Sequence, residues 1–210
     1  VLATGGFVSP PVAAAARRAG IPVIALCLDA VPGRAIRLVG RLAVRRLAGI
    51  PVAGGSRPWR SAEVTGVPVR RAAIAPGGPD ACRSRLGLDP SRPTLLVTGA
   101  SQGARTIDEL APAVAAREDR PLAGWQVVHL TGGGDPEPVE AAWSAAGVPA
   151  VVLPFLHEIG LAWGAATLAI SRAGAGSVAE AAANRVPTLF LPYPWHADEH
   201  QRHNAEPLAR

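Results

Sequence analysis

Six short apolar runs recur along the chain, and Gly or Pro bounds most of them. Their apolar residues stand at consecutive positions, which is typical of parallel strands that are buried on both faces. We therefore predict strands at residues 23–28, 93–99, 125–132, 150–155, 167–171 and 187–192.

Helical patterns fill the stretches between these runs. They predict helices at residues 10–19, 33–47, 104–118, 136–146, 158–163, 174–184 and 198–209. Because strands and helices alternate, we predict an α/β protein built on parallel, Rossmann-like sheets.

A stretch rich in Pro and Gly at residues 66–92 is only weakly periodic and separates two parts of this pattern. We expect residues 1–68 to be the later part of one domain, residues 69–92 a linker with the start of a second domain, and residues 93–210 most of that second domain. Since the pattern opens in a strand and stops in a helix, we expect a fragment truncated at both ends.

Composition narrows the class of protein. Of the 210 residues, 49% are hydrophobic and 18% are charged, which excludes a disordered chain. We find no apolar run long enough for a transmembrane helix and no signal peptide. The chain has only two cysteines, which cannot make a disulfide framework, so we expect a reduced compartment. The net charge of +5 permits contact with phosphates, anionic lipid or nucleic acid, but the chain offers no aromatic platform for nucleic acid.

The turn Gly-Ala-Ser-Gln-Gly-Ala at residues 99–104 follows a predicted strand and opens a predicted helix. Small residues let the backbone approach a ligand, and the N-terminus of a helix offers free N–H groups to an anion. The turn is consistent with a diphosphate cradle to which Ser101 adds a hydroxyl, and equally with an ordinary connection of small residues. It is neither a GxGxxG motif nor a P-loop.

A second turn, Ser-Arg-Ala-Gly-Ala-Gly-Ser-Val-Ala-Glu at residues 171–180, also joins a strand to a helix. Gly174 and Gly176 open the backbone there, and Ser177 can cap the helix or touch phosphate. Glu180 stands three residues after Ser177, so it either completes a capping box or binds two sugar hydroxyls. The residues alone leave both interpretations open.

A third segment, at residues 196–205, contains His196, His200 and His203 at helical spacing. These histidines suggest zinc, but the chain has no HExxH motif and no further ligand is placed to complete a site. We favour a polar helix start that faces a sugar nucleotide, with three hydrogen-bonding side chains: Asp198, Gln201 and Asn204.

Three further features of the sequence are weaker indications of a binding site. A glycine turn at residues 4–11 precedes a helix, and Arg70 next to the linker suits either a diphosphate clamp or a solvated charge. Four arginines at helical spacing within residues 33–47 form a basic face that is either solvated or rests on anionic lipid. These arginines are Arg34, Arg37, Arg41 and Arg45.

The order of the motifs resembles glycosyltransferase family 28, the family of the bacterial N-acetylglucosaminyltransferases that form lipid II. The motifs read GGFVS, PVR, GASQGAR, SRAGAGSVAE and DEHQRHNA, and they cover nearly the whole chain. The resemblance implies a GT-B fold of two Rossmann-like domains, the N-terminal one incomplete here and the C-terminal one nearly complete. It also implies an inverting transfer of GlcNAc from UDP-GlcNAc to a lipid-linked muramyl-peptide acceptor, without a metal or another cofactor.

The resemblance assigns roles to matching residues. On the donor side, Arg70 and Ser101 are expected at the diphosphate, with Gln102 and Gly103 in the same turn as Ser101. The backbone of Leu156 is expected at the uracil, Glu180 at the ribose and Gln201 at the sugar hydroxyls, and Asn204 is a further donor-side residue. Four consecutive residues are expected to line the diphosphate and sugar: Gly174, Ala175, Gly176 and Ser177. The acceptor-side residues are Gly5, Gly6 and Asp29. The general base is expected outside these 210 residues, so no catalytic residue is named.

The chain departs from the family pattern mainly on the acceptor side. The family carries a His-Glu-x-Asn segment where this chain has Leu26, Cys27, Leu28 and Asp29. In addition, Ala100 replaces a Gly of the donor turn, and Val67 replaces an Asn. Two alternatives therefore stay open: a GT-B transferase with another glycolipid or small-molecule acceptor, and a UDP-sugar-binding protein without transferase activity.

The resemblance also implies partners and a location. We expect a UDP-sugar, a lipid-linked acceptor and the surface of the cytoplasmic membrane as partners, and no nucleic acid. The full protein is expected to be cytoplasmic and peripheral on the inner face of the cell membrane.

Overall fold

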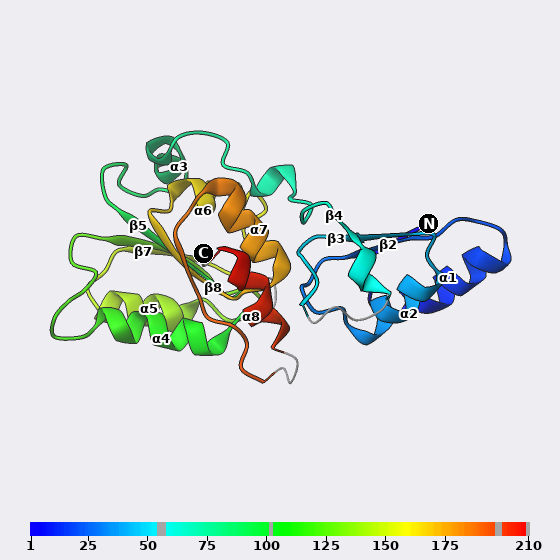
Figure 1. The fold of residues 1–210 in the computed structure, drawn as a ribbon. Helices are drawn as coiled ribbons and strands as arrows, with labels where there is room; N and C mark the ends of the chain where they lie inside the picture. Colours follow the sequence, from blue (N-terminus) through cyan, green and yellow to red (C-terminus); the bar gives the residue numbers. More distant parts are fainter. Residues whose placement is uncertain (54–57, 101–102, 196–198, 209–210) are drawn as a thin grey trace. The chain divides into compact units, whose positions relative to one another are not determined.

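The computed structural model describes residues 1–53, 58–100, 103–195 and 199–208 (Figure 1). The chain forms two compact units. The first unit comprises Val1–Pro68, Ala173–Ala179 and Pro192–Arg210, and the second comprises Val69–Arg172 and Glu180–Leu191. The assignment of an acceptor-side and a donor-side domain to the chain stays a prediction. No helix within the described ranges is long and apolar enough to span a bilayer.

A parallel four-stranded sheet organises the first unit, in the order β1 (Leu2–Ala3), β2 (Ile24–Cys27), β3 (Arg45–Ala48) and β4 (Glu63–Val64). Helices α1 (Ser9–Arg18) and α2 (Arg34–Leu42) lie on one side of it (Figure 1). Both helices contribute to a core that also takes side chains from β1 and β2: Ala3, Ala13, Ala16, Val23, Ala25, Cys27, Ile36, Val39, Ala43 and Trp59. The 3₁₀ helix η2 (Trp59–Ser61) supplies Trp59.

The helix predicted at residues 33–47 is wrong over residues 43–47. Helix α2 ends at Leu42, because Ala43 is extended, and the chain enters β3 at Arg45. Arg46 Nη1 donates to the carbonyl oxygens of Gly40 and Ala43, which caps the end of the helix. The helical spacing of the four arginines was misleading at Arg45, which lies on β3 and pairs with Glu63 at 2.6 Å.

A parallel five-stranded sheet organises the second unit, in the order β7 (Ala150–Leu153), β6 (Gln126–Leu130), β5 (Thr94–Thr98), β8 (Leu168–Ser171) and β9 (Thr188–Phe190). The order reverses between β5 and β8, and ligands of such sheets bind outside the carboxyl ends of the strands at this switch point. The five strands predicted after residue 92 are confirmed, as is a parallel sheet.

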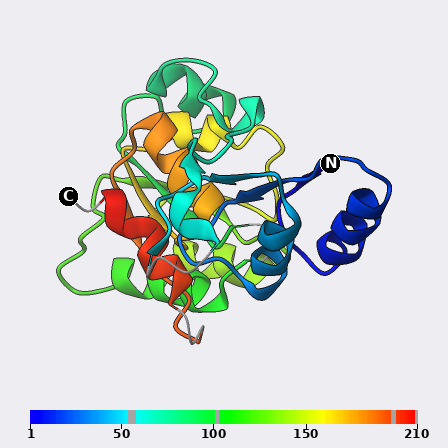
Figure 2. The same cartoon turned by 45° about the vertical axis from the view of Figure 1, so that its right-hand side comes forward.

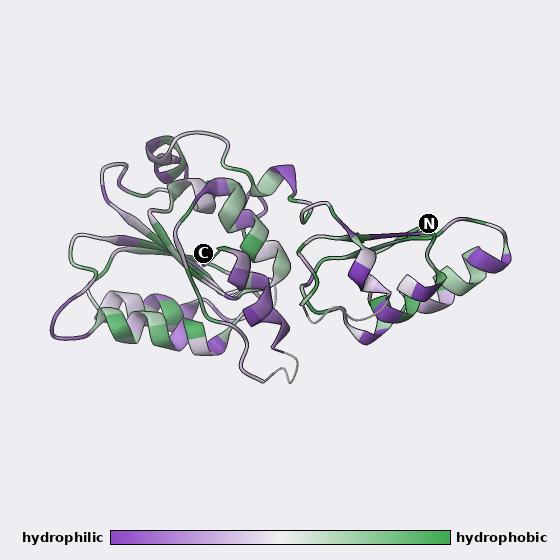
Figure 3. Ribbon diagram, in the orientation of Figure 1, coloured by the Kyte–Doolittle hydropathy of each residue, from purple (hydrophilic) through white to green (hydrophobic). Residues whose placement is uncertain are grey.

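Helices cover both faces of this second sheet. Helices α4 (Arg105–Ala115) and α5 (Glu137–Ala145) lie on one face, and α3 (Pro79–Arg85) and α6 (Gly160–Ala165) lie on the other (Figures 1 and 2). Along β5, Leu95 and Val97 pack with α4 and α5, whereas Leu96 packs with α6. This alternation explains why the strands are apolar at consecutive positions, and Figure 3 shows them as largely hydrophobic.

The weakly periodic stretch contains helix α3, which the sequence analysis did not predict. Pro79 occupies its first turn, Asp80 follows, and Arg83 and Arg85 lie in its last turn, so the helix carries favourable residues at both ends. Cys82 turns inward and packs with α6. The structure also describes η3 (Arg71–Ala73), α7 (Ala175–Asn184), α8 (His200–Ala205) and η4 (Glu206–Leu208).

A buried polar chain fixes α4 and α5 to the sheet. Trp143 on α5 donates its indole N–H to His129 Nδ1 at 3.0 Å, and His129 Nε2 lies 3.0 Å from Asp108 Oδ1 on α4. Because Nδ1 accepts, Nε2 carries the proton and donates to Asp108. Helix α4, which follows the glycine turn after β5, is thereby held in one position.

Candidate functional site

The turn after β5 is shaped by backbone packed closely on backbone. Gly103 has φ +71°, and a Cβ on it would lie 2.4 Å from the carbonyl oxygen of Thr131, which follows β6. A Cβ on Gly99 would lie 2.3 Å from the Ala104 nitrogen. Ala100, which replaces the family's glycine, has φ +62° and so takes a conformation that glycine adopts at lower cost. The turn therefore lies tight against the carboxyl edge of the sheet, while Ser101 and Gln102 fall outside the described residues.

The turn after β8 leads directly into α7. The helix begins at Ala175, so Ser177 lies inside its first turn, and the capping box considered for Ser177 and Glu180 is wrong. A Cβ on Gly174 or Gly176 would meet no atom within 4 Å. The predicted diphosphate and sugar residues Gly174–Ser177 thus form the start of a helix with open space beside its two glycines.

Glu180 on α7 is the predicted site residue with the most specific surroundings in the second unit. Its Oε2 accepts the indole N–H of Trp163 at 3.0 Å, and its Oε1 lies 3.7 Å from Arg70 Nη2. The Glu180 side chain is 15% exposed, whereas that of Arg70 is 65% exposed. The structure therefore brings together the two side chains that were predicted at the ribose and at the diphosphate.

Asn184, one turn further along α7, fixes the chain segment that carries Arg70. Its Nδ2 donates to the carbonyl oxygens of Glu180 and Ala73, both at 2.8 Å, and its Oδ1 accepts the N–H of Ala75 at 2.8 Å. The bonds to Ala73 and Ala75 hold the chain just beyond Arg70 against α7, whereas the bond to Glu180 lies within α7. Sequence analysis missed this residue, since nothing in the pattern around Asn184 indicates contacts more than one hundred positions away.

Leu156 follows β7 at the carboxyl edge of the second sheet, where the turn after β5 also lies. Its side chain is half-buried and packs with the cores on both sides of α6. The neighbouring Phe155 is exposed, and its ring meets the ring of His157 edge to face at 5.0 Å. The role of the Leu156 backbone at the uracil stays a prediction.

Arg172 is a second residue that the sequence analysis did not single out. It follows β8, is 9% exposed, and donates to the carbonyl oxygen of Leu191 at 3.0 Å and to Thr106 Oγ1 at 2.6 Å. It therefore links the turn before α7 to β9 and α4. An arginine placed immediately after an apolar strand is the signal that could have revealed it.

In the first unit, Asn204 joins three segments that are distant in sequence. It is fully buried; its Oδ1 accepts the Ala30 N–H at 2.8 Å, and its Nδ2 donates to Asp29 Oδ1 at 2.9 Å and to the Ala173 carbonyl oxygen at 3.2 Å. Asp29, predicted on the acceptor side, and Asn204, predicted on the donor side, are therefore direct partners.

The other polar residues of α8 are engaged locally. Gln201 Oε1 accepts the Tyr193 N–H at 2.9 Å, and His203 Nδ1 lies 3.1 Å from Glu206 Oε2. His196 and Asp198 fall outside the described residues. Among the residues that are described, no group of three potential metal ligands is found.

Gly5 and Gly6 form the turn between β1 and α1. They have φ +111° and +82°, a region that favours glycine, and the Ser9 hydroxyl donates to the Gly5 carbonyl oxygen. The turn thus lies at the carboxyl end of β1, and ligands of parallel α/β sheets bind outside the carboxyl ends of the strands. Its assignment to the acceptor stays a prediction.

The residues of β2 that differ from the family pattern belong to the core. Leu26 and Cys27 are buried, and Cys27 Sγ donates to the Asp29 carbonyl oxygen at 3.2 Å. Burial, reinforced by the charge of Asp29, raises the pKa of the Cys27 thiol to about 12. Cys27 is therefore a neutral thiol that fills the core, and it offers neither a nucleophile nor a base.

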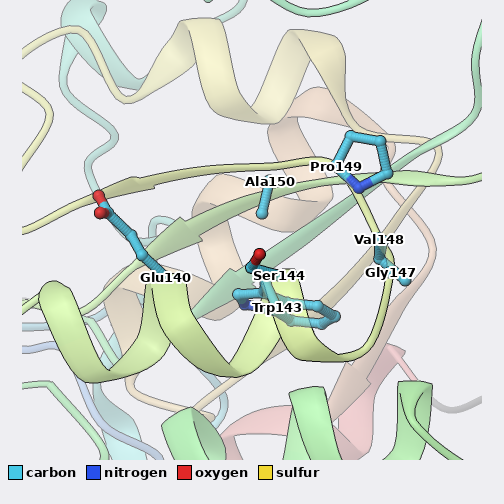
Figure 4. A pocket seen from close by; sticks show the side chains of 7 residues that line it. All are labelled: Glu140, Trp143, Ser144, Gly147, Val148, Pro149 and Ala150. Carbon is cyan, nitrogen blue, oxygen red and sulfur yellow. The ribbon is translucent and has the colours of Figure 1, made fainter.

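A cavity of about 560 Å³ lies beside α5 and β7 (Figure 4). It is lined by Glu140, Trp143, Ser144, Gly147, Val148, Pro149 and Ala150. None of the predicted site residues lines it. Its position at the N-terminal end of β7, away from the carboxyl ends of the strands, separates it from the candidate site.

The fold and the turns define a class: two parallel α/β sheets of the GT-B type, with glycine turns at the carboxyl ends of strands. The model of the glycosyltransferase family 28 C-terminal domain matches residues 94–210. The chain belongs to glycosyltransferase family 28.

Similar proteins agree with this assignment. An enzyme of Nocardioides sp. named UDP-N-acetylglucosamine--N-acetylmuramyl-(pentapeptide) pyrophosphoryl-undecaprenol N-acetylglucosamine transferase is 41% identical over 99% of this chain and 56% of its own length. Among solved structures, MurG of Acinetobacter baumannii is 30% identical, with a TM-score of 0.74 over 100% of this chain and 56% of its own. UDP-GlcNAc 2-epimerase of Neisseria meningitidis, solved with UDP-GlcNAc, is 13% identical with a TM-score of 0.60 over 67% of its own chain, and so shares the fold alone. The chain spans about half the length of the curated relatives it matches.

Proposed function

We propose that the protein is an inverting glycosyltransferase that moves GlcNAc from UDP-GlcNAc to a lipid-linked muramyl-peptide acceptor, the step from lipid I to lipid II in peptidoglycan synthesis. The observation that carries this proposal is the pairing of Arg70 with Glu180 at 3.7 Å, in a chain of family 28. A cation for a diphosphate next to a carboxylate for a ribose suits the two ends of a nucleoside diphosphate.

The reaction is a single displacement. The acceptor hydroxyl oxygen bonds to the anomeric carbon of GlcNAc, the bond from that carbon to the β-phosphate oxygen breaks, and UDP leaves with the electron pair. The hydroxyl proton passes to a general base.

Each donor-side residue has a role in this proposal. Arg70 and the N–H groups of the turn that contains Ser101, Gln102 and Gly103 stabilise the charge that develops on UDP, so that no metal is required. Leu156 presents its backbone to the uracil and Glu180 accepts from the ribose. The first turn of α7 lies along the diphosphate and sugar, and Gln201 binds sugar hydroxyls.

Exposed apolar and arginine side chains of the first unit favour a lipid acceptor. Phe7 and Val8, before α1, are 100% and 72% exposed, and Arg17 and Arg18 are exposed at the end of α1. Three of the four arginines on the predicted basic face remain exposed on α2, which contacts α1: Arg34, Arg37 and Arg41. Apolar side chains next to arginines suit the surface of an anionic membrane, so we propose a peripheral location on its cytoplasmic face.

A second function has its own support. The buried Leu26 and Cys27 lack the polar groups that the family carries on β2, which favours a GT-B transferase with a different glycolipid or small-molecule acceptor. A UDP-sugar-binding protein without transferase activity is the remaining alternative.

A transfer assay with the full-length protein separates these functions. We expect labelled GlcNAc to pass from UDP-GlcNAc to an undecaprenyl-diphosphate-linked muramyl pentapeptide, with one UDP released for each product. Glu180→Gln is expected to lower kcat/KM by about 10- to 100-fold, because a charge-assisted hydrogen bond to the donor is lost. Transfer only to another glycolipid would support the second function, and UDP-GlcNAc binding without any transfer would support the third.

A further inference from the structure

Trp163 carries a polar atom into an otherwise apolar core. It lies on α6, is 1% exposed, and packs in the cluster that includes Leu96 and Val128. A buried indole N–H needs a hydrogen-bond partner, and a phenylalanine would fill such a position without that requirement. The partner here is a carboxylate, Glu180 Oε2 at 3.0 Å, which belongs to the next helix along the chain.

This hydrogen bond determines how the Glu180 carboxylate is presented. A free glutamate side chain samples many rotamers, and holding one oxygen removes most of that freedom before any ligand arrives. The other oxygen, Oε1, lies 3.7 Å from Arg70 Nη2, which is beyond hydrogen-bonding distance. Oε1 therefore retains its capacity to accept hydroxyl donors.

The backbone of Glu180 is held as firmly as its carboxylate. The Glu180 carbonyl oxygen accepts from Asn184 Nδ2, and the same amide group binds Ala73 and Ala75, just after Arg70. Asn184 thus sets the distance between α7 and the segment carrying Arg70, while Trp163 sets the direction of the carboxylate between them.

We propose that Trp163 is a positioning residue for nucleoside recognition: its indole N–H orients the Glu180 carboxylate to accept from the ribose 2′- and 3′-hydroxyls of a uridine nucleotide. The inference rests on the proposed function, because it takes Glu180 as the nucleoside-binding carboxylate. Discrimination between ribose and deoxyribose then depends on a tryptophan that does not itself touch the ligand.

Binding of UDP and of 2′-deoxy-UDP, measured by calorimetry, tests this role. Trp163→Phe removes the N–H and keeps an aromatic ring in the core. Trp143→Phe is the matched control, because Trp143 is also 1% exposed and also donates its indole N–H at 3.0 Å, but to His129 on the other face of the sheet. Both variants are expected to lose thermal stability, so stability alone does not separate a positioning role from a structural one.

The ratio of the two dissociation constants does separate them. The wild type and Trp143→Phe are expected to prefer UDP over 2′-deoxy-UDP by about tenfold or more, and Trp163→Phe by less than about threefold. An unchanged preference in Trp163→Phe, or equal binding of both nucleotides by the wild type, would overturn the inference. A folded wild type that binds neither nucleotide would instead overturn the proposed function.

A measurement on the wild type covers the case in which Trp163→Phe does not fold. In ¹⁵N-edited NMR spectra, UDP is expected to shift the indole N–H signal of Trp163 and to leave that of Trp143 in place. The reason is that the hydroxyls of the ribose draw on the same carboxylate to which the Trp163 N–H donates. A Trp163 signal that stays unmoved at saturating UDP would count against the inference.

Discussion

Gly103→Ala is expected to lower the free energy of unfolding by about 3 kcal/mol or more and to abolish tight UDP binding. The left-handed backbone at φ +71° disfavours any side chain, and the new Cβ would lie 2.4 Å from the Thr131 carbonyl oxygen. Backbone on both sides of this contact must shift, which displaces the turn that we propose as the diphosphate cradle. Urea denaturation and calorimetric UDP titration measure the two effects.

Gly124→Ala is the matched control, because it measures the cost of placing a side chain at positive φ without a close contact. Gly124 has φ +79°, but a Cβ on it would meet nothing within 4 Å. Its replacement is expected to cost about 1 kcal/mol and to leave UDP binding unchanged. Equal losses of stability in the two variants would contradict the close packing of the turn against Thr131.

Asn204→Leu is expected to destabilise the protein by about 3 kcal/mol, since it leaves three buried or half-buried groups without their partner. These groups are the Ala30 N–H, the Ala173 carbonyl oxygen and the Asp29 carboxylate. Asn204→Asp is expected to be destabilising as well, because it places a second carboxylate against Asp29 and the Ala173 carbonyl oxygen. Denaturation curves followed by circular dichroism provide the comparison.

Gln201→Ala, on the same helix α8, is the control for Asn204. Gln201 makes a single described hydrogen bond, to the Tyr193 N–H in an exposed setting, so its loss is expected to cost less than about 1 kcal/mol. If Asn204→Leu proved no more destabilising than Gln201→Ala, the three hydrogen bonds of Asn204 would not be the link between these segments.

The second sheet could be predicted from the sequence because its strands are buried on both faces. Leu95, Leu96 and Val97 alternate between two helical layers, and this produces the uninterrupted apolar run that marks a parallel strand. In the first unit, β2 carries this signal and was predicted at residues 23–28, whereas β1, β3 and β4 lack it. β1 and β4 have two residues each, which is too short for any period. β3 opens with Arg45, whose spacing from Arg37 and Arg41 imitates a helix.

The candidate site likewise contains features that could be predicted from the sequence and features that could not. Glycines such as Gly103 could be predicted, because a turn after a strand needs positive φ or close packing and the adjacent sequence displays both the strand and the turn. The contacts of Trp163 and Asn204 could not. Each joins residues that only the tertiary fold brings together, Trp163 to Glu180 across 17 positions and Asn204 to Asp29 across 175. Local patterns contain no trace of such partners.

A calorimetric titration of UDP, UDP-GlcNAc and UDP-glucose into the folded protein, with and without EDTA, tests the proposed UDP-sugar site directly. We predict that UDP and UDP-GlcNAc bind, that EDTA leaves their affinities unchanged, and that UDP-glucose binds more weakly than UDP-GlcNAc. If a protein shown to be folded bound no UDP under either condition, the glycine turns after β5 and β8 would be ordinary connections between strands and helices, and the proposal of a UDP-sugar site would be wrong.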